Sequence, residues 1–88
     1  MKKLAPLKSI YSFITVAETG SMTDAAKVLN VSHSAVSQAI KSLETQLGQA
    51  LFIRSGRTVT LNASGRRYYK QVAPAIEQIA IATQQITD

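Results

Sequence analysis

The sequence contains no cysteine, which excludes disulfides and metal sites built on thiolates. Its single histidine, His33, cannot form a multi-histidine cluster around a metal ion, so we expect neither a metal nor a cofactor. Only five acidic residues are present, and a Ser–His–Asp triad would require Asp24 to align with His33 from a different helix. The sequence therefore argues against an enzyme.

Long apolar runs are also absent. No segment approaches the ~18 apolar residues of a membrane span. The basic N-terminal stretch MKKLAPLKS is not followed by the unbroken apolar run of a signal peptide. We therefore expect no membrane association and a cytoplasmic location. With 88 residues, 45% of them hydrophobic, the chain is expected to form one domain with a buried core.

Positive charge is concentrated in the middle of the chain. The net charge is +5, and residues 21–67 carry six basic residues against Asp24 and Glu44. Residues 68–88 carry only Lys70 against Glu77 and Asp88. A basic excess on the compact part fits a surface that faces phosphate, although a merely soluble basic domain is the alternative.

Apolar residues at helical spacing predict two helices in the first thirty residues. The first runs from about residue 7 to 19, after Pro6, and ends at Gly20. Ser21 is a natural N-cap for the second, over residues 22–30. We expect this helix to bury Ala25, Ala26, Val28 and Leu29, with Asn30 left-handed and Val31 filling the turn that follows.

A third helix follows that short turn, capped by Ser32 and ended by Gly48. Its buried stripe is expected to contain Val36, Ile40, Leu43 and Leu47. The other side is small and polar, with almost no acid, and presents Ser32, His33, Ser34, Ser37 and Gln38. Such a face suits the major groove of DNA, where base edges offer hydrogen-bond donors and acceptors.

A hairpin is predicted next, because β-prone runs at residues 51–54 and 58–61 flank a Ser55-Gly56 turn. Directly after a helix-turn-helix, such a hairpin is a wing. Arg54 and Arg57 bracket its tip and could reach a phosphate or the minor groove; a solvated charged turn is the alternative.

A long last helix is expected from residue 63 to about 86, capped by Asn62. Apolar residues alternate at spacings of three and four, which is typical of a helix that pairs with another helix. We therefore predict a homodimer through this seam, with Pro74 bending the helix but not breaking it. The alternative is that the seam packs on its own domain. The seam consists of Tyr69, Val72, Ile76, Ile79, Thr83 and Ile86.

The order and spacing of these elements resemble the N-terminal DNA-binding domain of LysR-type bacterial transcriptional regulators. The resemblance covers about residues 7–67 and, more loosely, the helix to residue 86. It rests on Phe13, Gly20-Ser21, Thr23, Ala25-Ala26, Val31-Ser32, Ala35-Val36-Ser37, Ile40, Leu43-Glu44, Leu47-Gly48, Leu51-Phe52, Arg54, Arg57, Leu61, Ala63 and Gly65.

This resemblance implies a mainly α fold: a winged helix-turn-helix over residues 1–61, with a three-helix core and a two-stranded wing, and a linker helix over residues 62–88 that dimerises antiparallel with its mate. The third helix would enter the major groove of double-stranded DNA at an interrupted palindromic operator. Base contacts are implied for His33, Ser34, Ser37 and Gln38, and backbone contacts for Ser21, Thr23, Ser32, Lys41, Arg54 and Arg57.

Some residues depart from the family pattern. Many members have Gln in place of His33, often Pro in place of Ser34 and often Arg in place of Gln38. These differences affect the operator sequence and not the binding mode. Members also continue into a two-lobed small-molecule-binding domain, so we expect the inducer site to lie outside this sequence and the full-length protein to form dimers or tetramers.

The sequence is compatible with three classes of function. A sequence-specific binder of double-stranded DNA comes first, a dimerisation or protein-interaction module that uses only the last helix second, and an RNA-binding or nonspecific winged helix third. Within the first class, His33 could donate to a guanine or a phosphate, or have no base-specific role. Gln38 could bridge an adenine or be an ordinary exposed glutamine.

Overall fold

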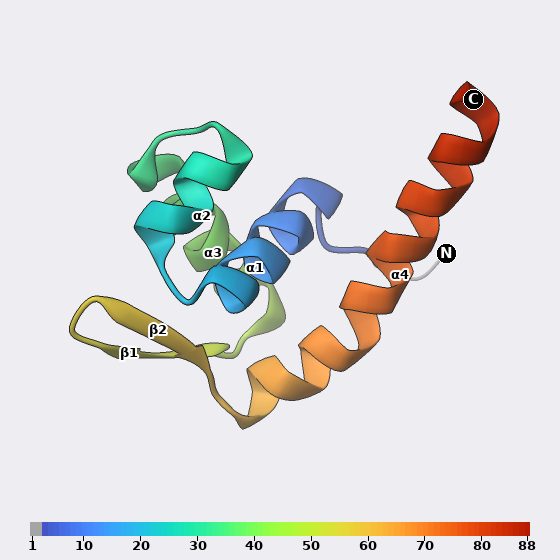
Figure 1. Cartoon of the computed structure of the whole chain (residues 1–88). Helices are drawn as coiled ribbons and strands as arrows, with labels where there is room; N and C mark the ends of the chain where they lie inside the picture. The colour runs from blue at the N-terminus through green and yellow to red at the C-terminus, as the bar shows by residue number, and fades with distance from the viewer. Residues whose placement is uncertain (1–2) are drawn as a thin grey trace.

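The computed structural model describes residues 3–88, so Met1 and Lys2 of the basic N-terminal stretch lie outside it. Four helices and one hairpin follow each other in the order α1, α2, α3, β1, β2, α4 (Figure 1). The fold is the mainly α winged helix-turn-helix expected from the sequence. The elements are α1 (Leu7–Thr19), α2 (Met22–Leu29), α3 (His33–Leu47), β1 (Phe52–Ser55), β2 (Thr58–Leu61) and α4 (Ala63–Thr87).

Side-chain caps determine where three of the helices begin. The Ser21 hydroxyl accepts from the Asp24 N–H at 3.1 Å, and the Ser32 hydroxyl accepts from the Ala35 N–H at 3.1 Å. Asn62 Oδ1 accepts from the Gly65 N–H at 2.8 Å. Each cap satisfies a backbone N–H that has no partner within its helix, typically worth about 1 kcal/mol. All three predicted caps are confirmed.

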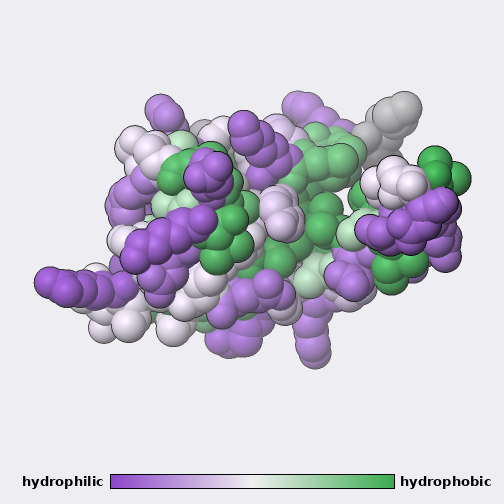
Figure 2. Space-filling view, turned by 45° about the horizontal axis from the view of Figure 1, so that its top comes forward, coloured by the Kyte–Doolittle hydropathy of each residue, from purple (hydrophilic) through white to green (hydrophobic). Residues whose placement is uncertain are grey.

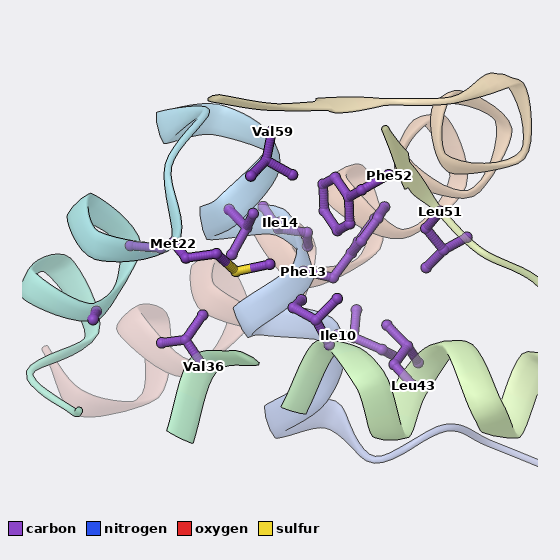
Figure 3. Close-up of a cluster of buried hydrophobic side chains, with 13 residues drawn as sticks. Ile10, Phe13, Ile14, Met22, Val36, Leu43, Leu51, Phe52 and Val59 are labelled. Atoms are coloured by element: carbon purple, nitrogen blue, oxygen red, sulfur yellow. The ribbon is translucent and has the colours of Figure 1, made fainter. Parts of the chain in front are cut away.

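The core lies where α1 and α3 meet the wing and the start of α4 (Figure 3). Phe13 is fully buried at its centre, with ring centroids 5.4 Å from Phe52 and 5.3 Å from Tyr68. Tilted aromatic pairs at this separation are favourable, and each buried large side chain adds roughly 1.5–3 kcal/mol by leaving water. One cluster therefore holds the helix-turn-helix, the wing and α4 in fixed relative positions.

The predicted buried face of α2 is partly wrong. Met22, Ala25 and Ala26 are buried and Leu29 is half-buried, whereas Val28 is 64% exposed. Residues 22, 25, 26 and 29 follow helical spacing, which turns position 28 outward. Val31 is also 40% exposed and does not fill the turn, although Asn30 is left-handed as predicted, with φ 57°.

The stripe of α3 also ends earlier than expected. Val36, Ile40 and Leu43 are buried, and Leu47, next to the cap at Gly48, is 38% exposed. The last turn of α3 therefore extends beyond the core.

The wing turn lies one residue later than the sequence suggested. Ser55 pairs with Thr58, so the two-residue turn is Gly56-Arg57. Gly56 has φ 61°, and a glycine at the first turn position suits the tight turns that match strand twist. The Val59 N–H donates to the Gly20 carbonyl at 3.0 Å, which fixes β2 against the α1–α2 turn.

Helix α4 begins in close contact with the rest of the domain. A Cβ at Gly65 would collide with the Leu51 carbonyl oxygen, so only glycine allows this approach of helix to loop. The predicted dimer seam divides along α4. Tyr69, Val72 and Ile76 pack partly against their own core, whereas Ile79 is 50% exposed and Ile86 86% exposed. The helix continues unbroken through Pro74 (Figure 1), and the bend expected there stays a prediction.

Candidate nucleic-acid interface

The four residues implied as base contacts come together on one side of α3. His33, Ser34, Ser37 and Gln38 line a single shallow surface hollow with Lys41. Ser37 is half-buried and the other four are exposed. Because Val36, Ile40 and Leu43 fix the opposite side of the helix in the core, this polar face has a defined direction.

Ser32 and Ser34 are linked at the start of this helix. The Ser32 hydroxyl caps the helix, and its oxygen lies 3.2 Å from the Ser34 hydroxyl, a hydrogen bond in which either can donate. Part of the hydrogen-bonding capacity of Ser32 is therefore used internally. Ser34 keeps either its hydrogen or its lone pairs for a ligand, depending on the direction of that bond.

The remaining backbone-contact candidates gather in a second hollow, which we call the wing notch. It is lined by Ser21, Met22, Thr23, His33, Arg54, Gly56, Arg57 and Val59. Helix α2 supplies one wall, the wing supplies the other, and His33 at the start of α3 borders both this notch and the hollow on α3. The structure thus joins Arg54 and Arg57 to Ser21 and Thr23, while Lys41 lies apart on α3.

Strand register explains why Arg54 points into the notch. Arg54 pairs with Val59, and along β1 it alternates with Ile53, which is 55% exposed. Arg54 therefore shares the inner face of the hairpin with buried Phe52 and Val59. Arg57 lies in the turn itself.

The notch carries positive charge without an opposing acid in its lining. The arginines on α4 are engaged elsewhere: Arg66 donates to the Leu61 carbonyl at 3.1 Å and Arg67 to the Ser64 hydroxyl at 3.3 Å. Within residues 3–88, Arg54 and Arg57 form no such internal hydrogen bond and keep their planar donor groups for a ligand.

Several supporting contacts had no signal in the sequence. The Leu51 N–H donates to Glu44 Oε2 at 2.7 Å, and the Asn62 amide donates to the Ala50 carbonyl at 2.9 Å. The first bond ties the start of the wing to α3, and the second joins the residue before α4 to the loop before β1. Glu44 belongs to the family resemblance, but its hydrogen-bond partner lies in a loop whose path no periodicity reveals.

The α4 seam contains one unexpected polar contact. The Tyr69 hydroxyl donates to Glu18 Oε2 at 2.8 Å, and this hydrogen bond, with smaller effects of burial and of the carboxylate charge, raises the pKa of Tyr69 above 10.0. Burial raises the pKa of neighbouring Tyr68. Thr83 satisfies its own hydroxyl by donating to the Ile79 carbonyl at 2.8 Å, which lets a polar residue occupy a seam position.

Apolar surface extends beyond the seam. Leu4, Leu7 and Tyr11, in and before α1, are largely exposed, as are Ile79 and Ile86 on α4. Figure 2 shows hydrophobic surface on both sides of the hollow between the helical body and the C-terminal half of α4. Within residues 3–88, no helix has the combination of length and apolar character needed to cross a membrane.

Comparisons with known proteins agree with this geometry. A family model described as bacterial regulatory helix-turn-helix protein, lysR family, matches residues 7–66. The glycine cleavage system transcriptional activator of Escherichia coli (strain K12) is 38% identical over 85 residues, covering 97% of this chain and 28% of that protein.

Two solved structures share the fold. The full-length structure of AphB, a Vibrio cholerae virulence activator of the LTTR protein family, matches with a TM-score of 0.88 at 33% identity, covering 96% of this chain and 29% of that one. The CbnR DNA-binding domain, solved in complex with DNA, matches with a TM-score of 0.84 at 30% identity, covering 94% and 95% respectively.

The fold is therefore that of a winged helix-turn-helix DNA-binding domain. The chain belongs to the LysR family of bacterial regulatory helix-turn-helix proteins. Its relatives are transcriptional regulators and not enzymes, which agrees with the sequence argument against a catalytic site. The chain spans less than a third of the length of relatives such as the glycine cleavage activator, of which it covers 28%.

Proposed function

We propose that this chain is the part of a LysR-type transcription regulator that binds double-stranded DNA sequence-specifically. Helix α3 enters the major groove and presents His33, Ser34, Ser37 and Gln38 to the bases. The observation that carries this proposal is that these four side chains share one exposed hollow on a helix whose other side is fixed in the core. Ser32 and Lys41 contact the backbone beside them.

The wing supplies contacts that do not depend on base sequence. Arg54 and Arg57 approach the backbone or the minor groove from beside α3, with Ser21 and Thr23 at the start of α2. Their guanidinium groups suit phosphate because each offers several donors in one plane.

A homodimer through α4 would place two such helices on one duplex. Ile79, Thr83 and Ile86 supply the exposed part of the seam, while Tyr69, Val72 and Ile76 set the direction in which α4 leaves the domain. A second copy whose α4 runs antiparallel would cover this apolar surface together with exposed Leu7 and Tyr11. Each protomer would then read one half of an interrupted palindrome.

The remaining properties of the proposal concern a longer protein of the kind its relatives form. A small-molecule inducer would act through a separate domain beyond α4, and the full-length regulator would assemble as a dimer or tetramer in the cytoplasm. Relatives of this chain are about three times as long, since the chain covers 29% of AphB.

Selection of bound sites from a random duplex pool, followed by titration with salt, tests the function. We expect a strong preference for the selected site and a log–log salt slope near −0.9 for each phosphate neutralised. The double variant Ser37→Ala/Gln38→Ala should lose much of the preference, at roughly 1–3 kcal/mol for each base contact. Arg54→Ala/Arg57→Ala should weaken all duplexes alike.

The competing classes give different results in the same assay. A pure interaction module would bind no duplex at low salt, and a nonspecific winged helix would yield no enriched site. Tighter binding to RNA than to duplex DNA would favour the RNA-binding alternative. Any of these three outcomes would replace the proposal.

A further inference from the structure

We propose that the wing notch is a seat for one backbone phosphate, in which His33 and Arg54 grip the phosphate from two sides. Protonation of His33 in this seat makes duplex affinity rise as pH falls. This inference rests on the proposed DNA binding and changes one point of it. His33, which the family resemblance and the proposed function give as a base contact, is assigned instead to the phosphate backbone, and Ser34, Ser37 and Gln38 remain the base contacts.

The position of His33 is the first support. It is the first residue of α3, one turn before Ser37, and it borders the wing notch as well as the hollow on α3. Ser34, Ser37, Gln38 and Lys41 line only the hollow on α3. His33 is thus the only one of the four implied base contacts that faces the wing.

The rigidity of the notch is the second support. Arg54 lies on the inner face of the hairpin, and the bond from the Val59 N–H to the Gly20 carbonyl holds that hairpin against the turn before α2. Buried Met22 and Val59 line its base, and Thr23 adds a hydroxyl at its edge. A duplex that places α3 in its groove would bring a phosphate to the gap between α3 and the wing.

The surrounding charges define the ligand. From the wing, Arg54 and Arg57 face the notch, and Lys41 lies two turns along α3 from His33. Helix α2 carries Lys27 and one acid, Asp24, and neither lines the two hollows. A phosphodiester supplies the negative charge that this cluster of cations lacks.

Histidine makes this seat sensitive to pH. An imidazole changes charge between about pH 5 and 8, the range in which arginine stays charged and phosphodiester stays anionic. A bound phosphate would place a negative charge beside the imidazole and favour its charged form, so phosphate binding and protonation assist each other.

The test measures duplex affinity at pH 6 and pH 8 at constant ionic strength, on the selected site and on a random-sequence duplex. We expect the wild-type chain to bind both duplexes roughly fivefold more tightly per subunit at pH 6, the gain from one added charge about 4 Å from a phosphate in water. His33→Gln, a neutral hydrogen-bonding replacement, should lose this ratio. Ser34→Ala, in the hollow on α3 but not in the notch, should keep the ratio whatever its absolute affinity.

A second measurement is independent of affinity. Because the chain has a single histidine, the imidazole proton signals in an NMR titration report on His33 alone. Binding of a random-sequence duplex should move their titration to higher pH, and Arg54→Gln should reduce that movement.

The outcomes separate this inference from the proposed function. A pH effect confined to the selected site would mean that His33 contacts a base, and an equal affinity at both pH values would mean that it contacts nothing charged; either result overturns the phosphate seat while DNA binding stands. Absence of duplex binding at both pH values would instead overturn the proposed function.

Discussion

The two halves of α4 share one spacing pattern but have different surroundings. In the first half, Gly65 lies against the loop at Leu51, and the Tyr68 ring packs at a tilt against Phe13. In the second half, the seam residues Ile79 and Ile86 are also apolar, but they are 50% and 86% exposed. Helical spacing identifies an apolar face, but whether the domain itself or another molecule covers that face depends on where the helix lies.

This difference suggests a division of labour along one helix. The first half of α4 contributes to the stability of a single chain, because its contacts lie within that chain. The second half contributes little to that stability and remains available for a second copy. Changes in each half should therefore affect different measurements.

The largest effect is expected for changes in the second half of α4. Ile79→Gln/Ile86→Gln should weaken a dimer by about 4 kcal/mol, since four isoleucine side chains, two from each protomer, would be lost from a symmetric interface. Sedimentation should show the variant as a monomer at concentrations where the wild type is dimeric. Its free energy of unfolding as a monomer should change little.

Ile81→Gln is the matched control for that experiment. Ile81 is 42% exposed on the same helix but lies outside the spacing of the seam. If Ile81→Gln dissociates the dimer as strongly as the seam variant, the predicted seam is wrong.

In the first half of α4, Gly65→Ala should destabilise the folded chain by about 3 kcal/mol. Alanine normally stabilises a helix by about 1 kcal/mol relative to glycine. A lower free energy of unfolding in this variant would therefore be due to the collision with the Leu51 carbonyl. Urea unfolding would measure it, with Gln78→Ala, on the exposed part of the same helix, as control. Unchanged stability would mean that α4 can move away from the loop without cost.

Pro74 lies between the two halves and tests whether they act as one helix. Pro74→Ala restores an N–H that can bond to the Lys70 carbonyl, and we expect a gain of about 1 kcal/mol, less than the full cost of a helix-interior proline because the helix already accommodates it. Hydrogen exchange should slow for residues 75–87 and stay unchanged for α1. Faster exchange beyond residue 74 would show that the proline is needed for the position of α4.

Local chemistry explains how much of this molecule its sequence predicts. The caps at Ser21, Ser32 and Asn62, the left-handed Asn30 and the polar face of α3 each follow from neighbouring residues, and all have the predicted geometry. The polar face of α3 and the wing arginines followed from the residues themselves, and their contact roles from the family resemblance. The structure gathers all the DNA-contact candidates except Ser32 in two hollows.

Features that depend on distant contacts were not predictable in the same way. The bond from the Leu51 N–H to Glu44 depends on the path of a loop. The membership of His33 in both hollows depends on where the wing folds back. Spacing along the chain contains none of these positions, because they arise only when the elements pack.

The smallest effect is expected from Tyr69→Phe, which removes the hydrogen bond to Glu18 that ties the first half of α4 to α1. At neutral pH the loss should be below about 1 kcal/mol, as for other exposed hydrogen bonds. Because folding raises the pKa of Tyr69, the bond stabilises the fold below about pH 10, and this contribution disappears as pH rises through the folded-state value. Urea unfolding should therefore be measured at neutral pH and above pH 10. Between these two conditions the wild type should lose more free energy of unfolding than Tyr69→Phe, in which Tyr68 remains as a reference tyrosine. Equal losses in the two proteins would mean that the contact between α4 and α1 depends on apolar packing alone.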